Sequence, residues 1–352
     1  MRISVVERIE RGDALSRLRT GPPDPERYSE WHHFNFNDDA NGLYGIFNLA
    51  LSGDVRDPDA SRAGVSLVVS EQGRWRGTMN LYGTEEAAFD AGAVDLALGA
   101  NSVRWHDGVY HVQGALKDGS VRIDATWSPR CEGVRVDNIG GVVSTFILPR
   151  LDVTGSLEVD GRPYRLRGAT GYHDHNWGYW TWGQDMGWDW GYIIESRPPA
   201  PAGTASAGDA GRPLSIVFGQ VTDASRDRAK SDLVLVIWTG ERCTQVFLDD
   251  AVRISTEGEL ASDAVPRVPG VLALLEGRRS TVPRRLEIRA EDGDDWIEVV
   301  MEADHALQFL VPHAGGKGTT TVSELVGRYS VKGELDGDPV DFSYIGFAEL
   351  AG

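Results

Sequence analysis

The stretch GYHDHNWGYWTWGQDMGWDWGYIIE, residues 171–195, gathers indole, imidazole and carboxyl groups at high density. It holds five of the chain's eleven tryptophans, two of its eight histidines and three aspartates. Two runs within it are typical of β-strands. Because successive side chains of a strand point to opposite faces, the first run directs His173 and His175 to one face and Asp174 to the other.

The second run alternates in the same way. Trp188, Trp190 and Tyr192 share one face, and Asp189 lies on the opposite face together with Gly191. A glycine inside a strand often marks the close approach of a ligand. We therefore expect the missing side chain at Gly191 to leave room for a ligand beside the carboxyl group of Asp189.

Alternating runs recur along almost the whole chain after residue 28, with turn residues between them. The 42 glycines and 16 prolines can supply these turns. The pattern predicts an all-β fold of antiparallel strands with few helices. The clearest runs are residues 43–51, 64–70, 75–82, 108–116, 121–127, 214–221, 232–238, 285–291, 295–303 and 327–335.

Helices are expected in only a few places. The best candidate covers residues 3–19, and a shorter helix is expected near residues 266–277. The segment 85–99 could also hold a helical turn.

The length and the sheet edges suggest two domains. So many antiparallel strands must hide their edges, which barrels and sandwiches do, and 352 residues are enough for two such units. We predict an N-terminal β domain over residues 1–155 and a C-terminal β domain over residues 156–352. The segment 197–213 is interpreted as a flexible hairpin loop, because residues 188–195 and 214–221 resemble the two arms of one hairpin.

The composition of the chain limits the classes of molecule that it is expected to bind. A formal net charge of −18 disfavours nucleic-acid backbones and anionic lipid surfaces. No apolar run approaches the roughly 20 residues that cross a bilayer, and the N-terminus lacks the apolar region of a signal peptide. We expect a cytoplasmic protein with a hydrophobic small-molecule partner, no nucleic acid and no stable membrane insertion.

The aromatic stretch suggests acid chemistry at a carbon–carbon double bond. Indole faces stabilise a cation by about 2 kcal/mol or more in dry surroundings. A carboxyl group among them is poorly hydrated, so its pKa rises and it can stay protonated near neutral pH. Such an acid can protonate an isolated double bond, and the carbocation is then quenched by water or by another double bond.

This hypothesis assigns roles to individual residues. Asp189 or Asp174 would donate the proton, while His173 and His175 would orient the acid or relay the proton. Tyr192 would position water or a substrate carbonyl. The expected substrate-binding side chains are Trp31, Trp177, Trp180, Trp182, Trp188, Trp190 and Tyr192.

Other interpretations stay open. The tryptophans and the His-Asp-His group could form a scaffold, since buried indoles and phenols need hydrogen-bond partners. His173 and His175 could bind zinc together with a carboxylate, but this spacing alone is weak evidence, and we predict no metal and no cofactor. Asn35 and Asn37 are expected to stabilise a hairpin or to line the pocket mouth. Glu349 is expected to pair at the domain seam rather than to act in catalysis.

The motifs GYHDHNWG (171–178) and GWDWGYII (187–194) resemble the signature of the carotenoid 1,2-hydratase (hydroxyneurosporene synthase) and AttH-like superfamily. SEWHHFNFNDDANGLYGIFNLALSG (29–53) resembles its opening strands, and YIGFAEL (344–350) resembles its closing strand. The resemblance therefore touches both ends and the middle of the chain. It implies two lipocalin-like (calycin) β-barrel or sandwich domains, with the ligand pocket at or near their interface.

The resemblance also implies activities. Some members hydrate a terminal isoprenoid double bond without a redox cofactor, and fungal relatives catalyse intramolecular Diels–Alder cyclisation. By position, His175 and Trp177 match the histidine and tryptophan implied for the hydratases. GYWTWGQDM (178–186) replaces the usual proline-containing run. The extra Trp180 and Trp182 imply a more aromatic pocket of different shape.

Three functions are therefore weighed. The first is an acid-catalysed hydratase or cyclase, a hydro-lyase or isomerase, acting on an isoprenoid-like or polyketide-like substrate. The second is a pericyclase that folds a linear polyene into a reactive conformation and polarises a carbonyl with a Trp or Tyr donor. The third is a non-catalytic, lipocalin-like carrier of an apolar ligand. We predict the first and keep the others as alternatives.

Overall fold

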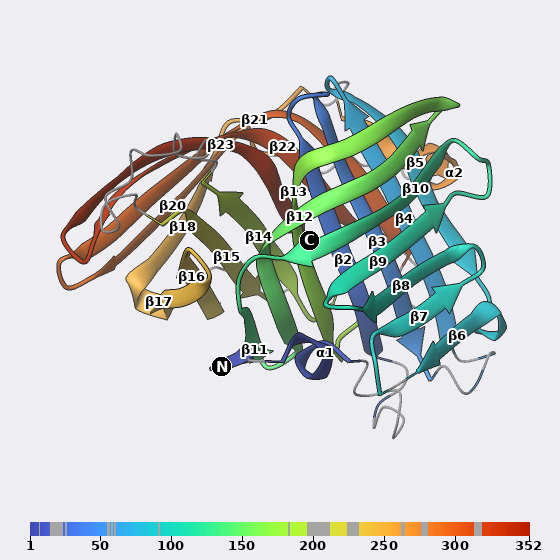
Figure 1. Ribbon diagram of the computed structural model, residues 1–352, viewed down its shortest axis with the longest axis horizontal. Helices are drawn as coiled ribbons and strands as arrows, with labels where there is room; N and C mark the ends of the chain where they lie inside the picture. Colours follow the sequence, from blue (N-terminus) through green and yellow to red (C-terminus); the bar gives the residue numbers. More distant parts are fainter. Residues whose placement is uncertain are drawn as a thin grey trace.

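The computed structural model describes residues 1–6, 8–14, 24, 27–54, 57, 59, 61–90, 92–181, 184–195, 212–223, 232–261, 265–275, 281–312 and 319–352. Within them the chain forms two curled sheets whose strands are antiparallel apart from one short parallel pair. Figure 1 shows the first sheet, blue to light green, beside the second, olive to red. The predicted all-β class is therefore confirmed. None of the helices among these residues has the length and apolar character needed to cross a membrane.

The first sheet contains thirteen strands among the described residues. Its main path runs in the order β5-β4-β3-β2-β13-β12-β10-β9-β8-β7-β6, and β11 joins β12 and β1 beside this path. The bounds are β1 (Arg2–Val6), β2 (Tyr28–Asp38), β3 (Leu43–Gly53), β4 (Ser61–Glu71), β5 (Arg74–Tyr82), β6 (Ala87–Asp90), β7 (Asp95–Leu98), β8 (Asn101–His106), β9 (Val109–Ala115), β10 (Val121–Pro129), β11 (Gly133–Ile139), β12 (Val143–Val159) and β13 (Arg162–Tyr179).

The second sheet contains ten strands among the described residues. Its path runs in the order β17-β16-β15-β14-β23-β22-β21-β20-β18, and the short β19 pairs in parallel with β21. The bounds are β14 (Gly187–Ile194), β15 (Leu214–Thr222), β16 (Asp232–Thr239), β17 (Arg242–Leu248), β18 (Val252–Glu257), β19 (Arg267–Val268), β20 (Arg285–Asp292), β21 (Asp295–Pro312), β22 (Thr319–Leu335) and β23 (Asp338–Ala351).

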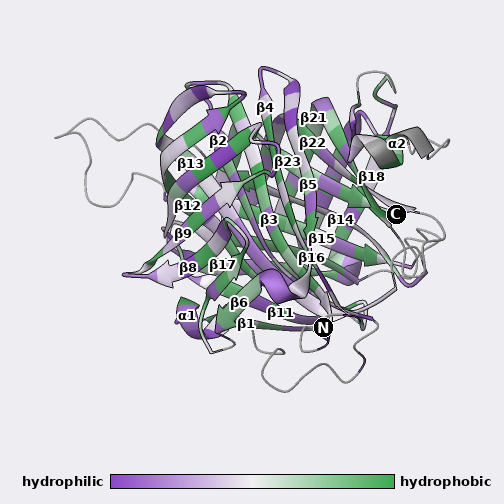
Figure 2. Cartoon of the chain, turned by 90° about the vertical axis from the view of Figure 1, so that its right-hand side faces the viewer, coloured by the Kyte–Doolittle hydropathy of each residue, from purple (hydrophilic) through white to green (hydrophobic). Residues whose placement is uncertain are grey.

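Alternation of apolar and polar residues builds both sheets, and Figure 2 shows it as alternating hydrophobic and hydrophilic bands along the strands. In β10 the burial pattern alternates strictly from Val121 to Ala125. The first sheet curls until strands that do not pair come into contact. A Cβ atom at Gly114 of β9 would lie 2.9 Å from the ring of Phe47 in β3, so only glycine permits this closure without a shift.

The chain passes from the first sheet to the second between Tyr179 and Gly187. The domain boundary expected near residue 155 falls inside β12, and the strand that follows it, β13, still belongs to the first sheet. The predicted hairpin is confirmed, because β14 and β15 pair from Gly187 with Thr222 to Ile194 with Ser215. Residues 197–211 of the expected loop lie outside the described residues.

The helical predictions were met only in part. Residues 2–6, most of which were expected in a helix, form β1, because Ile3 and Val5 pair with Val136 and Val134 of β11. A single helical turn, α1 (Ile9–Gly12), follows, and residues 15–19 lie outside the described residues. The predicted helix near 266–277 is present as α2 (Gly270–Leu275), and a 3-10 turn, η1 (Thr84–Glu86), begins the segment 85–99.

Asn37 fastens the two sheets together. Its side-chain nitrogen donates to the hydroxyl oxygen of Tyr344 and to the carbonyl oxygen of Ile345, both at 2.6 Å. Its amide oxygen accepts a hydrogen bond from the Tyr192 hydroxyl at 3.0 Å. Asn37 therefore serves the seam between the sheets instead of the hairpin or pocket mouth expected from the sequence. Asn35 faces the same side of β2 and accepts a hydrogen bond from His33 Nε2 at 2.8 Å.

Candidate active site

A pocket lies at the seam between the two sheets. It holds about 780 Å³ of space free of protein atoms, including the part open to solvent. Strands β2, β12 and β13 of the first sheet and β14, β15, β16 and β23 of the second contribute to its lining. Much of the wall is apolar and comes from Ile147, Met186, Val217, Phe218, Val234 and Val236.

Three indole side chains line this pocket. The rings of Trp31 and Trp188 stack with centroids 6.4 Å apart and planes 27° apart. Trp190 lies across the ring of Tyr172, at 4.7 Å between centroids. The structure thus brings Trp31, Trp188 and Trp190 to one cavity, as the sequence hypothesis requires of substrate-binding residues.

Asp174 reaches the pocket from β13 and is nearly buried. The Tyr172 hydroxyl donates to its Oδ2 at 2.9 Å, and the Asn176 side-chain nitrogen donates to its Oδ1 at 2.5 Å. The Trp190 indole nitrogen in turn donates to the Tyr172 hydroxyl oxygen at 3.0 Å. Burial raises the pKa of Asp174 to about 8 against the effect of the Tyr172 hydrogen bond, and the charge of Glu349 raises it further.

Glu349 is a pocket residue that sequence reasoning did not place in catalysis. It is partly exposed, lines the pocket from β23, and accepts a hydrogen bond from the Trp188 indole nitrogen. Directly opposite it on β22 is Glu324, which is buried. Burial raises the pKa of both carboxyl groups, and the neighbouring charge of Glu349 raises that of Glu324 further. Sequence alone carried no signal for this pair, since it depends on the register of two strands.

Asp189 also lines the pocket and is fully buried. The space beside it at Gly191 is not available to a ligand, contrary to the sequence expectation. A Cβ atom at Gly191 would overlap the Phe218 ring and lie 2.9 Å from the Tyr329 hydroxyl oxygen. The glycine therefore accommodates two aromatic side chains of neighbouring strands.

His173, His175 and Trp177 do not line the pocket. They share the face of β13 opposite to Asp174, as the alternation predicted, and that face packs inside the first sheet. These two imidazoles therefore lie on the side of β13 away from the pocket and from Asp174. Trp177 meets a protein cation instead, because the Arg135 guanidinium lies 4.6 Å from its ring centroid.

The remaining aromatic candidates support the pocket from behind. Trp180 is buried and packs its edge against Trp31, at 5.4 Å and 88°. Tyr192 is buried and stacks on Tyr172, at 4.5 Å and 14°. Neither belongs to the lining, so both side chains lie behind the residues that face this pocket. Trp182 lies outside the described residues.

His33 was not singled out from the sequence, yet it lines the pocket opposite Asp174 in the pairing of β2 with β13. Its ring packs edge-on against Trp190, with centroids 5.7 Å apart. Burial lowers the pKa of His33 to about 4, so the imidazole is neutral at physiological pH. The adjacent His32 points to the other face, and only the alternation of β2 could have separated the two.

The fold is two-sheet and lipocalin-like, and in this chain a pocket lies at the seam between the sheets. By sequence, neither a protein-family model nor a curated protein matches it. By structure it is similar to an AttH-type protein from Nitrosomonas europaea, with a TM-score of 0.62 and 13% identity over 93% of this chain and 92% of the other. This agrees with the fold implied by the sequence resemblance.

Two further solved structures have the same fold. Kievitone hydratase from Nectria haematococca gives a TM-score of 0.55 at 12% identity, covering 93% of this chain and 90% of the hydratase. CghA in complex with Sch210972 gives a TM-score of 0.53 at 12% identity, covering 93% of this chain and 88% of CghA. At these identities the likeness establishes the AttH-like, lipocalin-like fold.

Proposed function

We propose that this protein is an enzyme that hydrates or cyclises a hydrophobic isoprenoid-like or polyketide-like substrate, without a redox cofactor. The observation that carries the proposal is an apolar pocket walled by indoles and lined by Asp174 and Glu349, with Glu324 buried next to Glu349. The fold likeness to a hydratase and to CghA, a Diels–Alderase, is consistent with such a reaction.

The carboxyl cluster supplies the proton. Like charges held close together away from water cannot all be ionised, so at least one of the three groups keeps its proton. Glu349 is the favoured donor, because it is partly exposed to the pocket while Glu324 is buried next to it. Both oxygens of Asp174 already accept hydrogen bonds, from Tyr172 and Asn176, which suits a supporting carboxyl group better than the donor.

The reaction then proceeds through a carbocation. The Glu349 proton and the π electrons of the double bond form a new C–H bond, which leaves an empty orbital on the neighbouring carbon. The indole faces of Trp31, Trp188 and Trp190 stabilise that charge by cation–π attraction. Addition of water gives the alcohol and returns a proton to the carboxyl cluster. Attack by a second double bond, followed by loss of a proton, gives a ring.

Heavy water tests this proposal. The protein is incubated in D2O with a panel of terpenoid and polyketide polyenes, and products are examined by NMR for deuterium at a new carbon centre. Deuterium incorporation that Glu349→Gln abolishes, and that the matched surface variant Glu334→Gln keeps, supports the proposal. Conversion without deuterium would indicate a pericyclase, and tight binding without conversion would indicate a carrier.

A further inference from the structure

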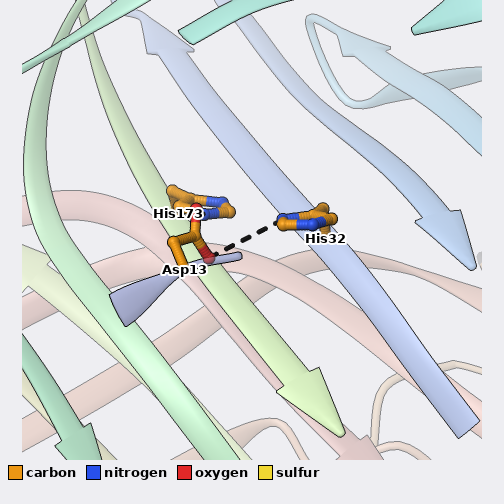
Figure 3. Close-up of side chains that lie close together, drawn as sticks. All are labelled: Asp13, His32 and His173. Carbon is orange, nitrogen blue, oxygen red and sulfur yellow. Dashed lines mark hydrogen bonds and ion pairs between the residues drawn. The ribbon is translucent and has the colours of Figure 1, made fainter. Parts of the chain in front are cut away.

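We propose that Asp13, His32 and His173 bind one divalent transition-metal ion inside the first sheet. Figure 3 shows the three side chains converging from separate parts of the chain. Asp13 follows α1, His32 lies on β2, and His173 lies on the neighbouring β13. All three are fully buried, and their ligand atoms lie within 4.8 Å of one another.

The separations suit an ion of moderate size. Asp13 Oδ2 lies 3.0 Å from His173 Nε2, and Asp13 Oδ1 lies 3.8 Å from His32 Nδ1. In a tetrahedral zinc site with bonds near 2.0–2.1 Å, ligand atoms are roughly 3.3 Å apart. Two imidazoles and a carboxylate form a donor set that suits zinc and similar divalent ions.

His32 supplies an independent observation. Neither of its ring nitrogens has a hydrogen-bond partner within the described part of the chain, although the side chain is fully buried. A buried polar group without a partner costs free energy, and most such groups in proteins are satisfied. A metal ion bound through Nδ1 would give this ring its partner next to Asp13.

The hydrogen bonds of His173 point the same way. Its Nδ1 lies 2.9 Å from the carbonyl oxygen of His33 and must carry a proton to donate there. This bond directs Nε2 toward the Asp13 carboxylate, 3.0 Å away. Either a proton or a metal ion can therefore link Nε2 to this carboxylate. Histidine ligands of metals are commonly oriented by such a bond from the second nitrogen to a carbonyl.

The surroundings favour a closed, structural site. The Tyr110 hydroxyl donates to Asp13 Oδ2 at 2.6 Å. His175 bridges two carboxylates, with Nδ1 at 3.1 Å from Asp13 and Nε2 at 2.7 Å from Glu30. The ion would fasten the N-terminal segment to β2 and β13, on the face opposite the indole-lined pocket. The proposal therefore stands apart from the proposed catalytic chemistry.

Zinc binding tests the site. The protein is stripped with a chelator, titrated with zinc, and measured by elemental analysis and by thermal unfolding. We expect one zinc ion per chain and a melting temperature that rises with zinc. His32→Gln should weaken binding by about 100-fold or more and remove the thermal shift. The control His111→Gln, at an exposed position of β9, should bind as the wild type does.

A second measurement keeps the proposal decidable if His32→Gln fails to fold. Cobalt added to the stripped wild-type protein should give the visible absorption of a low-coordinate site with nitrogen and oxygen ligands, and zinc should displace it. Wild-type protein that binds neither ion, or His32→Gln that folds and binds zinc unchanged, would overturn the metal site. Asp13 and His173 would then be linked by a direct hydrogen bond.

Discussion

Glu324 and Glu349 occupy directly opposite positions on β22 and β23, where like charges repel. Glu349 lines the pocket, Glu324 is buried next to it, and burial raises the pKa of both carboxyl groups. Two acidic groups in such a register retain a proton at pH values where exposed glutamates have lost theirs. This gives the pocket an acid whose proton can be tracked experimentally.

Loss of the Glu349 carboxyl group should abolish most turnover. General acid catalysis typically contributes about 10²–10⁴-fold, so Glu349→Gln should lower kcat by at least about 100-fold on any substrate converted with deuterium incorporation. Stopped-flow single-turnover assays measure this step directly. Circular dichroism checks that the fold is kept, and Glu334→Gln on the exposed side of β22 should retain wild-type rates. Wild-type turnover in Glu349→Gln would remove this residue from the mechanism.

The activity should depend on pH in one direction. Since the protonated form of Glu349 is the donor and its pKa is raised from 4.5, kcat should be highest at low pH. It should fall as pH rises through the raised pKa. A pH–rate profile over the range in which the protein stays folded measures the effect. A rate that instead increases through this range would indicate a general base.

Protein stability should respond to pH through Glu324. Its folded pKa lies well above the ordinary 4.5, so the folded state binds more protons than the unfolded state between these values. The free energy of unfolding contributed by this group is fully present below about pH 4.5 and is lost as pH rises through the folded pKa. Urea titrations at several pH values should therefore show a shallower decline in Glu324→Gln than in the wild type. Parallel curves for the two proteins would contradict this assignment.

Removal of an indole should slow the cationic step. A cation–π contribution of about 2 kcal/mol corresponds to a rate factor of roughly 30, so Trp31→Leu should lower kcat by about that factor. Trp105→Leu, in the first sheet and away from the pocket, should leave kcat unchanged. Equal losses in both variants would indicate a general effect on the fold.

Gly191 should tolerate no side chain. Alanine there would overlap the Phe218 ring, and overpacking of this kind typically costs about 1–3 kcal/mol. Gly64→Ala is a matched control in β4, where the nearest atoms to an added Cβ lie at 3.6 Å. Urea unfolding should show a clear loss of stability for Gly191→Ala and little change for Gly64→Ala. A neutral Gly191→Ala would revive the idea of open space beside Asp189.

The sequence correctly predicted the structural features that depend on the local alternation of side chains. Alternation alone separated Asp174 from His173 and His175, and it predicted the hairpin of β14 and β15. The predicted helix over residues 3–19 was wrong at its start, because the spacing of Ile3 and Val5 also fits a strand and β11 offers a free edge for pairing.

Features that depend on contacts between distant strands escaped sequence reasoning. The opposition of Glu324 and Glu349 follows from strand register, and the filling of Gly191 by Phe218 and Tyr329 follows from packing across strands. Asp13 reaches His173 across 160 positions of sequence. No periodic pattern encodes such separations.

The paired strands β2 and β13 form one wall that separates the pocket from the interior of the first sheet. On β13, the side chains of Asp174 and Asn176 face the pocket, while those of His173 and His175 face the interior of the first sheet. Substitutions at Asn176, which lines the pocket, can therefore change specificity without touching the inner network. Inserting or deleting one residue there would exchange the two sides, so this wall should accept substitutions far more readily than changes in length.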